Sequence, residues 1–180
     1  RYCMRTQGRV LALTSSGTGA MEAAVANLLS PGDKAVVYTT GVFGDRFVEI
    51  LKAYGLNPVV VGEEWGRAAS PERLAAALRT HRDAKVVFVQ HTDTSTGVVN
   101  DLKALSAVVR AESEAVLVVD AISGLGGEPL ETDLWGLDVV LSASQKGLMN
   151  APGLSFMSVS DRAWARVEKA ALAQASGKRV

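Results

Sequence analysis

An acid stands directly after an apolar segment of this 180-residue sequence. Asp120 follows the run Ala-Val-Leu-Val-Val, so its carboxylate emerges from apolar surroundings. An ionised carboxylate beside low-dielectric walls is costly unless a cation or hydrogen-bond donors face it. The residue therefore calls for a polar partner, and a metal ion or a nucleotide ribose could serve. An aspartate in this position also occurs in many α/β folds without a ligand.

An amine stands in a similar position one segment later. Lys146 lies among very small residues, in the run Ala143-Ser144-Gln145-Lys146-Gly147. A lysine that only decorates a surface loop has no need of such neighbours, although that is the common fate of a lysine. An amine that is desolvated beside another cation becomes partly neutral and can attack an aldehyde. Lys146 is therefore a candidate for Schiff-base chemistry.

A turn of small residues near the start of the chain suits a phosphate. Ser15–Gly19 joins an apolar run to a helix predicted at Ala20–Leu29. Such a turn offers free backbone N–H groups at the positive end of a helix dipole, and the hydroxyls of Ser16 and Thr18 add two donors. An ordinary structural turn is the alternative. The pattern differs from the dinucleotide fingerprint because Glu22 stands where the third glycine belongs.

Two more segments carry groups that could contact a small ligand. The segment 91–97 is dense in hydroxyls, as expected of a loop that hydrogen-bonds a small polar molecule, and an ordinary polar turn is the alternative. Phe43, within Gly41–Gly44, offers an aromatic face at the start of a helix. A core residue is the alternative for Phe43. Both segments follow apolar runs, as Asp120 and Lys146 do.

These residues need a scaffold that brings the ends of apolar runs together. Short β-rich runs alternate with helical patterns, which is typical of an α/β protein with a mostly parallel sheet. Several runs are apolar nearly throughout, as strands covered on both faces must be. The sequence thus predicts a three-layer, doubly wound sandwich whose ligands lie at the carboxyl ends of the strands. The predicted strands are Val10–Thr14, Lys34–Tyr38, Pro58–Val61, Lys85–Gln90, Ala115–Asp120, Asp138–Ser142 and Leu154–Ser158.

The helices between these strands have readable ends. One helix has apolar residues spaced along a single face and ends before Gly55, where a C-cap belongs. Another begins with Ser70 as its N-cap and Pro71 in the first helical position. The apolar spacing from Leu102 to Val109 marks a further helix, and an alanine-rich helix lies near the end of the chain. No internal repeat or linker divides the sequence, so it predicts one domain.

Composition narrows the partners. The 19 basic and 19 acidic side chains cancel, so no net field draws the protein to nucleic acid or to a membrane surface. One cysteine, Cys3, and two histidines provide no plausible zinc set, so no metal site is predicted. No apolar run approaches the roughly 20 residues of a membrane span. The expected setting is the reducing cytoplasm, and the expected ligand is small.

Taken in order, five motifs resemble fold-type I pyridoxal-phosphate (PLP) enzymes, and specifically the large domain of class V aminotransferases of the alanine–glyoxylate and serine–pyruvate group. The order of the motifs is more specific than any one of them. The matching stretches are Ser16–Ala24, Gly41–Arg46, Ser95–Val98, Val119–Gly127 and Ser142–Leu148. The resemblance as a whole covers nearly all of the chain, from about Val10 to Val159.

The resemblance implies a role for each candidate residue. Lys146 would form the Schiff base with pyridoxal 5'-phosphate and carry the substrate's Cα proton. Asp120 would pair with the protonated pyridine nitrogen of the cofactor. The remaining roles are phosphate binding by Ser16, Gly17, Thr18 and Gln145, contact of Thr94 with the phenolic oxygen, and stacking of Phe43 and Ile122 on the two faces of the ring.

The resemblance also identifies a competitor. Cysteine desulfurases share the fold but have a histidine stacked on the ring and another immediately before the lysine. Phe43 and Gln145 stand in those positions here. The aminotransferase group often has tryptophan in place of Phe43, and phenylalanine still supplies a stacking face. Transamination between an alanine- or serine-type amino acid and glyoxylate or pyruvate is therefore the expected activity.

The resemblance covers only the middle of a family member, so we expect residues 1–180 to be a single cofactor-binding large domain and a fragment. Family members carry an N-terminal segment and a C-terminal small domain, and the small domain supplies the arginine that binds the substrate carboxylate. Full-length members form homodimers in which the partner completes the phosphate site. An alternative is a PLP-binding remnant without turnover. A nucleotide-binding protein would explain the Ser16 turn but would leave Lys146 and Asp120 without a role.

Overall fold

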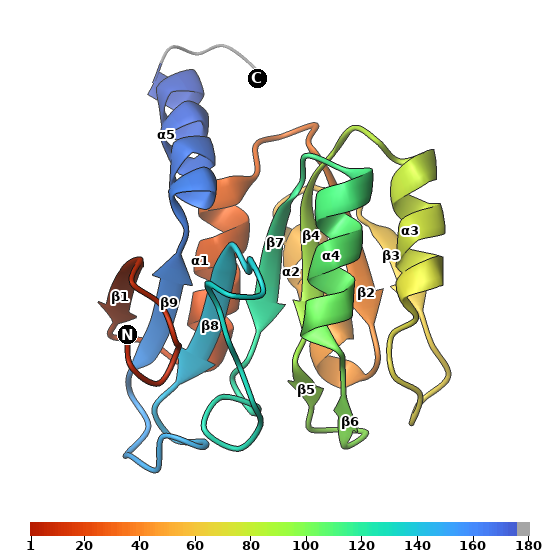
Figure 1. Cartoon of the computed structure of the whole chain (residues 1–180). Coiled ribbons are helices and arrows are strands. Elements are labelled where there is room, and N and C mark those ends of the chain that lie inside the picture. Colours follow the sequence, from red (N-terminus) through yellow and green to blue (C-terminus); the bar gives the residue numbers. More distant parts are fainter. Residues whose placement is uncertain (176–180) are drawn as a thin grey trace.

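The computed structural model describes residues 1–175 and shows a central sheet with helices on both faces (Figure 1). The sheet has seven strands in the order β1-β9-β8-β7-β4-β2-β3. Every neighbouring pair is parallel except β8–β9 and β9–β1. Because β9 alone runs against the others, the remaining strands, β1 included, have their carboxyl ends at the same edge of the sheet. This confirms the predicted three-layer α/β fold with a mostly parallel sheet.

All seven predicted strands are present, each within one residue of its predicted ends. Their apolar character follows from their position, since β7 and β8 are buried along their whole length. The strands are β1 Arg9–Leu13, β2 Lys34–Thr39, β3 Val59–Gly62, β4 Ala84–Gln90, β7 Val116–Asp120, β8 Val139–Ala143 and β9 Ser155–Val159.

A small hairpin was not predicted. The strands β5 (Thr92–Asp93) and β6 (Val98–Val99) pair antiparallel, next to the end of β4. The sequence indicated only a hydroxyl-rich loop here, because two-residue strands are too short to produce a recognisable alternation. The hairpin keeps residues 91–97 at the carboxyl edge of the sheet.

The helices follow their end signals. Helix α1 begins at Gly17, three residues before its predicted start, because Ser16 is the N-cap and its side chain accepts a hydrogen bond from the Gly19 N–H. Helix α3 has the predicted Ser70 cap, and Gly55 follows α2 with φ +73°. The helices are α1 Gly17–Leu28, α2 Val42–Ala53, α3 Pro71–Thr80, α4 Leu102–Glu112 and α5 Asp161–Ala175.

Two apolar cores cover the two faces of the sheet. Helices α1, α2 and α5 contribute to one core, in which Met21 and Phe47 are almost fully buried. Helices α3 and α4 contribute to the other core, with Leu74 and Leu105 at its centre. Within residues 1–175, no helix is both long enough and apolar enough to cross a membrane.

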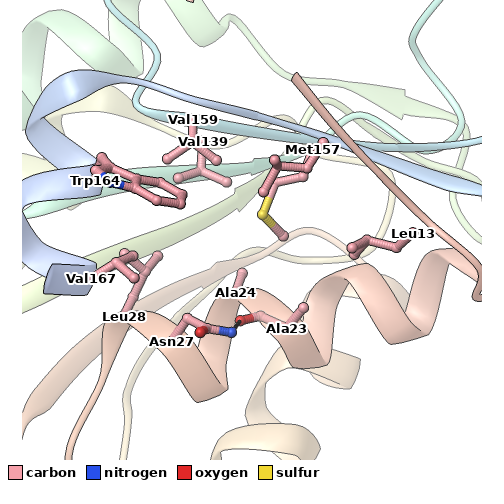
Figure 2. Close-up of a pocket in the computed structure, with 11 residues that line it drawn as sticks. Leu13, Ala23, Ala24, Asn27, Leu28, Val139, Met157, Val159, Trp164 and Val167 are labelled. Atoms are coloured by element: carbon pink, nitrogen blue, oxygen red, sulfur yellow. Dashed lines mark hydrogen bonds between the residues drawn. The ribbon is translucent and has the colours of Figure 1, made fainter. Parts of the chain in front are cut away.

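One cavity interrupts the first core. It has a volume of about 150 Å³ and lies between α1, α5 and the strands β1, β8 and β9 (Figure 2). Its walls are almost entirely apolar and include Met157 and Trp164. The candidate residues of the sequence analysis are absent from its lining. The cavity is thus a packing feature that is separate from the carboxyl edge of the strands.

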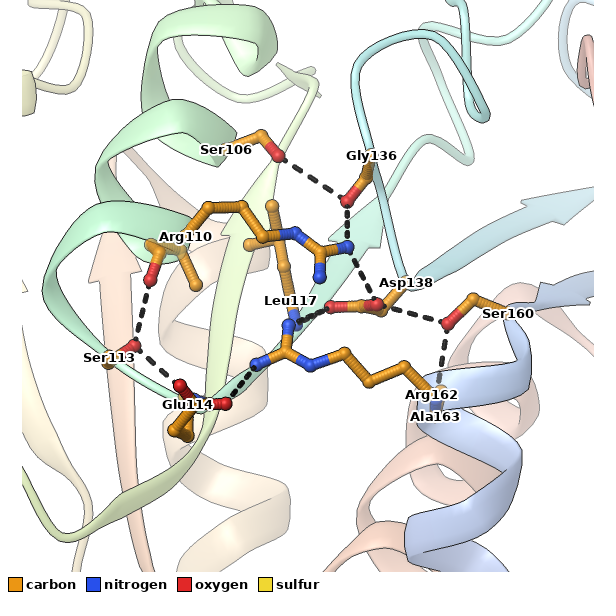
Figure 3. A network of polar contacts seen from close by, with 12 residues as sticks. Ser106, Arg110, Ser113, Glu114, Leu117, Gly136, Asp138, Ser160, Arg162 and Ala163 are labelled. Carbon is orange, nitrogen blue, oxygen red and sulfur yellow. Dashed lines mark hydrogen bonds and ion pairs between the residues drawn. The ribbon is translucent and has the colours of Figure 1, made fainter.

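A buried carboxylate ties the amino ends of two strands to two helices (Figure 3). Asp138 is fully buried and precedes β8. Its oxygens accept hydrogen bonds from Arg110 at 3.0 Å, from Arg162 at 3.2 Å, from the Ser160 hydroxyl at 3.0 Å and from the Leu117 N–H at 2.9 Å. The sequence predicted Asp138 as a strand residue, whereas its side chain joins α4, β7 and the start of α5.

Candidate active site

The carboxyl ends of three central strands form the floor of the candidate site. Asp120 ends β7 and is aligned with Gln90 of β4 on one side and Leu141 of β8 on the other. The backbone N–H of His91 donates to the Asp120 carbonyl at 2.7 Å, which extends the pairing beyond β4. The Asp120 carboxylate is therefore fixed at the centre of the sheet edge.

Burial has the largest effect on the pKa of Asp120. The residue is 4% exposed, and the backbone N–H of Ile122 donates to its Oδ1 at 2.9 Å. Burial raises the pKa of this carboxyl from 3.8 to about 7; the Ile122 hydrogen bond opposes the rise, the charge of Asp93 adds to it, and the charge of Lys146 opposes it. No basic side chain hydrogen-bonds to Asp120 within residues 1–175. A cation placed against this carboxyl would stabilise its ionised form.

Lys146 lies in the loop that follows β8, close to the segment that follows β7. Gly147 packs so tightly on the Leu125 carbonyl that a Cβ there would overlap it, and a Cβ on Gly126 would lie 2.9 Å from the Gly147 carbonyl oxygen. These two glycines let the loops touch, which explains the glycine that follows Lys146. The Lys146 side chain is exposed and lowers the pKa of Asp120 through its charge. An amine and a buried acid are thus electrostatically coupled.

The turn at the start of α1 meets the same region. Gly17 is buried, and a Cβ there would lie 2.6 Å from Cδ1 of Ile122, so a larger residue would require the Ile122 side chain to move. Ser16 and Thr18 are exposed beside it. The first N–H groups of a helix have no intrahelical acceptor. The turn can therefore offer backbone donors to an anion close to Ile122.

Two loops meet through hydroxyls at the edge of the site. The hydroxyls of Thr94 and Ser123 are hydrogen-bonded at 2.5 Å, which joins the β5–β6 hairpin to the segment after β7. Both groups lie near the surface, and each can rotate toward another partner. Thr94 is thus held near Asp120 by a contact between two loops.

Phe43 lies in the first turn of α2 and is half-buried. Neither apolar core includes it. This argues against the alternative that Phe43 is a core residue. Its backbone N–H donates to Oδ2 of Asp93 at 3.0 Å, which ties the start of α2 to the β5–β6 hairpin.

Gln145 is the predicted residue with the weakest structural link to the others. It is exposed, and its side chain makes no hydrogen bond within residues 1–175. Its position is defined only by its neighbour Lys146. The suggested contact of Gln145 with a phosphate remains a prediction.

The sequence analysis missed three buried polar residues beneath the site. Asp93 is fully buried, and Gln90 and His91 are 1% and 2% exposed. Both side-chain polar atoms of Gln90 and Nδ1 of His91 lack a hydrogen-bond partner within the described chain. Burial lowers the pKa of His91, with an opposing effect of the Glu128 charge, which favours the neutral imidazole. The only signal in the sequence for these three residues was their position at or just after the end of a predicted strand. That position does not indicate which side chains are buried.

No group of three or more potential metal-ligating side chains was found within residues 1–175. The residues that gather at the edge are instead an acid, an amine, hydroxyls, an aromatic ring and a helix N-terminus. This combination can hold a small, flat, anionic molecule that carries both a basic nitrogen and an electrophilic carbon. The structure brings together Ser16, Gly17, Thr18, Phe43, Thr94, Asp120, Ile122 and Lys146 along one edge of the sheet.

Comparison with known proteins gives a consistent result. A family model described as Aminotransferase class-V matches residues 7–178. The soluble hydrogenase small subunit of Synechococcus sp. is 47% identical over 174 residues, covering 96% of this chain and 45% of that protein. The serine–glyoxylate aminotransferase of Methylorubrum extorquens is 38% identical over 161 residues, covering 88% of this chain and 40% of that protein.

A solved structure agrees in fold as well as in sequence. The alanine–glyoxylate aminotransferase of Nostoc sp. superposes with a TM-score of 0.89 at 36% identity. The match covers 94% of this chain and 45% of that one. The chain thus spans less than half the length of each of these three proteins.

Proposed function

The chain belongs to the class-V aminotransferase family, and from that premise we propose that it binds pyridoxal 5'-phosphate at the carboxyl edge of β7 and β8. We propose further that the whole protein transfers an amino group from an alanine- or serine-type amino acid to a small 2-oxo acid such as glyoxylate or pyruvate. The observation that carries the proposal is that two loops meet: Asp120 ends β7 beside β8, and the loop after β8 that carries Lys146 packs on the segment after Asp120 through Gly126 and Gly147.

The environment of Asp120 fits this cofactor. A buried carboxyl with one backbone donor and a pKa of about 7 is suited to a cationic partner. A protonated pyridine nitrogen would be such a partner. The tight contact of Gly17 with Ile122 adds a second match, because it brings helix N–H donors close to the acid. A ring with a phosphate on one side and a basic nitrogen on the other would satisfy both.

The proposed roles divide among the residues at the edge. Ser16, Gly17, Thr18 and Gln145 would bind the phosphate, and Thr94 would contact the phenolic oxygen. The ring of Phe43 and the side chain of Ile122 would pack against the cofactor ring.

The reaction needs a proton held on the ring nitrogen of the cofactor and a second proton moved from the substrate's Cα. When bound, the cofactor supplies an electron sink for the substrate's Cα. Asp120 would hold a proton on the ring nitrogen of the cofactor, which would strengthen that sink. The Lys146 amine would accept the substrate's Cα proton as a general base and would act as the general acid when a proton is returned.

The names of relatives support the substrate class. The Methylorubrum protein is a serine–glyoxylate aminotransferase and the Nostoc protein an alanine–glyoxylate aminotransferase. The Synechococcus relative carries a hydrogenase name.

Reduction with borohydride tests the proposal. The protein is mixed with PLP, reduced, digested and mapped by mass spectrometry. We expect the label on Lys146, its loss in Lys146→Ala, and its retention in the control Lys103→Ala, which alters a lysine on α4. A label spread over other lysines, or no label, would refute the assignment of the site. Transfer from alanine or serine to glyoxylate then separates an enzyme from a PLP-binding remnant without turnover.

A further inference from the structure

Asp93 has a complete set of hydrogen-bond donors although it is fully buried. Its Oδ2 accepts from the backbone N–H of Phe43 at 3.0 Å and of Gly44 at 3.3 Å. Its Oδ1 accepts from the N–H of Ser95 at 3.1 Å and from the Ser95 hydroxyl at 2.6 Å. Hydrogen bonds to a carboxylate are stronger than those between neutral groups. Asp93 is thus a firm connection between α2 and the β5–β6 hairpin.

The carboxylate takes the place of a missing cap. The N-cap residue of α2 is Gly41, which has no side chain to accept from the first turn. Asp93 supplies the acceptor from about 50 residues further along the chain, at the end of the helix where negative charge is favoured. A Cβ on Gly41 would lie 2.6 Å from Cγ of Asp93. The glycine that leaves the helix uncapped therefore also makes room for the distant cap.

The charge of the Asp93 carboxylate also acts on Asp120. This charge adds to the effect of burial in raising the pKa of Asp120. Thr94, the predicted contact of the phenolic oxygen, lies between Asp93 and Ser95, both of which are held by these hydrogen bonds. Asp93 is therefore linked to three residues that the proposed function uses.

We propose that Asp93 is a positioning residue of this site, which fixes Phe43 and Thr94 relative to each other and places a second negative charge near Asp120. The inference rests on the proposed function for its meaning, since Phe43 and Thr94 matter as cofactor contacts. Asp93 would act on the cofactor indirectly, through Phe43 and Thr94. This role also explains why a carboxylate, rather than an apolar residue, is buried at this point.

Two variants separate position from charge. Asp93→Ala removes the acceptors and the charge, whereas Asp93→Asn keeps an oxygen that can accept from Phe43 and Gly44. The matched control is Asp101→Asn, because Asp101 caps α4 through the Ala104 N–H at 3.0 Å and is exposed. If Asp93→Ala does not fold, Ser95→Ala serves as the milder variant; it removes one donor to Asp93 and also the acceptor of the Val42 N–H.

The first readouts need no cofactor. In Asp93→Ala, amide hydrogen exchange at Phe43 and Gly44 should be faster by about tenfold or more, and in Asp93→Asn it should change little. The midpoint of Asp120 titration, followed by carbon NMR, should fall in both variants. The Asp101→Asn control should leave both measurements unchanged. Unchanged exchange in Asp93→Ala, or an unchanged Asp120 midpoint in both variants, would overturn the proposal.

The last readout uses PLP itself. Asp93→Ala should raise the dissociation constant for PLP by about tenfold, through loss of a fixed Phe43 and Thr94. Asp93→Asn should stay near the wild-type value, because loss of attraction to a cation is offset by easier ionisation of Asp120. If the wild type binds PLP and Asp93→Ala binds it with the same affinity, the positioning role is contradicted. A wild type that does not bind PLP would refute the proposed function, while exchange and titration would still decide whether Asp93 is the anchor.

Discussion

Asp120 links the stability of the protein to the chemistry of its proposed site. A carboxyl at the end of a buried strand gives up hydration and receives one backbone hydrogen bond in return. Such an arrangement lowers the stability of the protein alone and favours a ligand that brings a cation. We interpret the raised pKa of Asp120 as a property of a site that becomes complete when its ligand is bound.

The pH dependence of unfolding should reveal this carboxyl. The pKa of Asp120 is raised from 3.8 to about 7, so between these values the folded state holds a proton that the unfolded state has lost. Stability therefore falls as pH rises through this window, by roughly 4 kcal/mol in total. Asp120→Asn should remove that part of the slope and be more stable than the wild type at pH 8. Urea unfolding of both proteins at several pH values measures it, and parallel slopes would contradict the prediction.

The sequence predicts the role of some residues of the candidate site and not of others. Lys146 was recognisable because glycine, serine and alanine lie within three residues of it, and the structure explains Gly147 by its contact with Leu125. Asp93 was not recognised, because the helix that it caps begins about 50 residues earlier in the chain. A cap supplied by a sequence neighbour, such as Ser70, is readable, whereas a cap from a distant element is not.

At the scale of elements, strands were predicted most accurately because burial on both faces leaves a continuous apolar run. The start of α1 was placed too late, since Gly17 and Gly19 are poor helix formers and their role is to allow close contacts. The β5–β6 hairpin was missed because each strand has two residues. The sequence therefore predicts elements with a long run of buried apolar residues. It misses elements, or ends of elements, that depend on a few individual contacts.

Asp138 should be the most important polar residue for joining elements. Removing it by Asp138→Ala leaves Arg110 and Arg162 without their common acceptor and the Leu117 N–H buried and unpaired. We expect a loss of about 3 to 5 kcal/mol in the free energy of unfolding. The control is Asp83→Ala, which breaks the exposed pair with Lys34 and should cost less than about 1 kcal/mol. Similar losses in the two variants, measured by urea unfolding, would show that the buried network is not the cause.

At the scale of the whole molecule, the order of strands decides which residues meet. The alternation of strands and helices predicted the layers, but the reversed direction of β9 could not be read from its apolar pattern. The reversal leaves β1 parallel to β8 and keeps the Ser16 turn at the same edge as Asp120 and Lys146. The site is thus a consequence of topology as much as of motif.

The cavity between α1 and α5 should accept a larger side chain. Ala23 lines it, and Ala23→Leu places a good helix former into apolar space (Figure 2). We expect a gain of about 1 kcal/mol in the free energy of unfolding. Ala26→Leu, on the same helix but outside the cavity lining, is the control. A thermal melt in which Ala23→Leu is less stable than the control would show that the cavity cannot accept the side chain.

The central claim is that Lys146 and Asp120 act on the two ends of one bound ring. A crystal structure of the protein with pyridoxal 5'-phosphate tests it most directly. The account predicts electron density that joins Nζ of Lys146 to the aldehyde carbon, with an Asp120 oxygen within hydrogen-bonding distance of the ring nitrogen. A ring bound elsewhere, or one that touches Lys146 with its nitrogen turned away from Asp120, would contradict it.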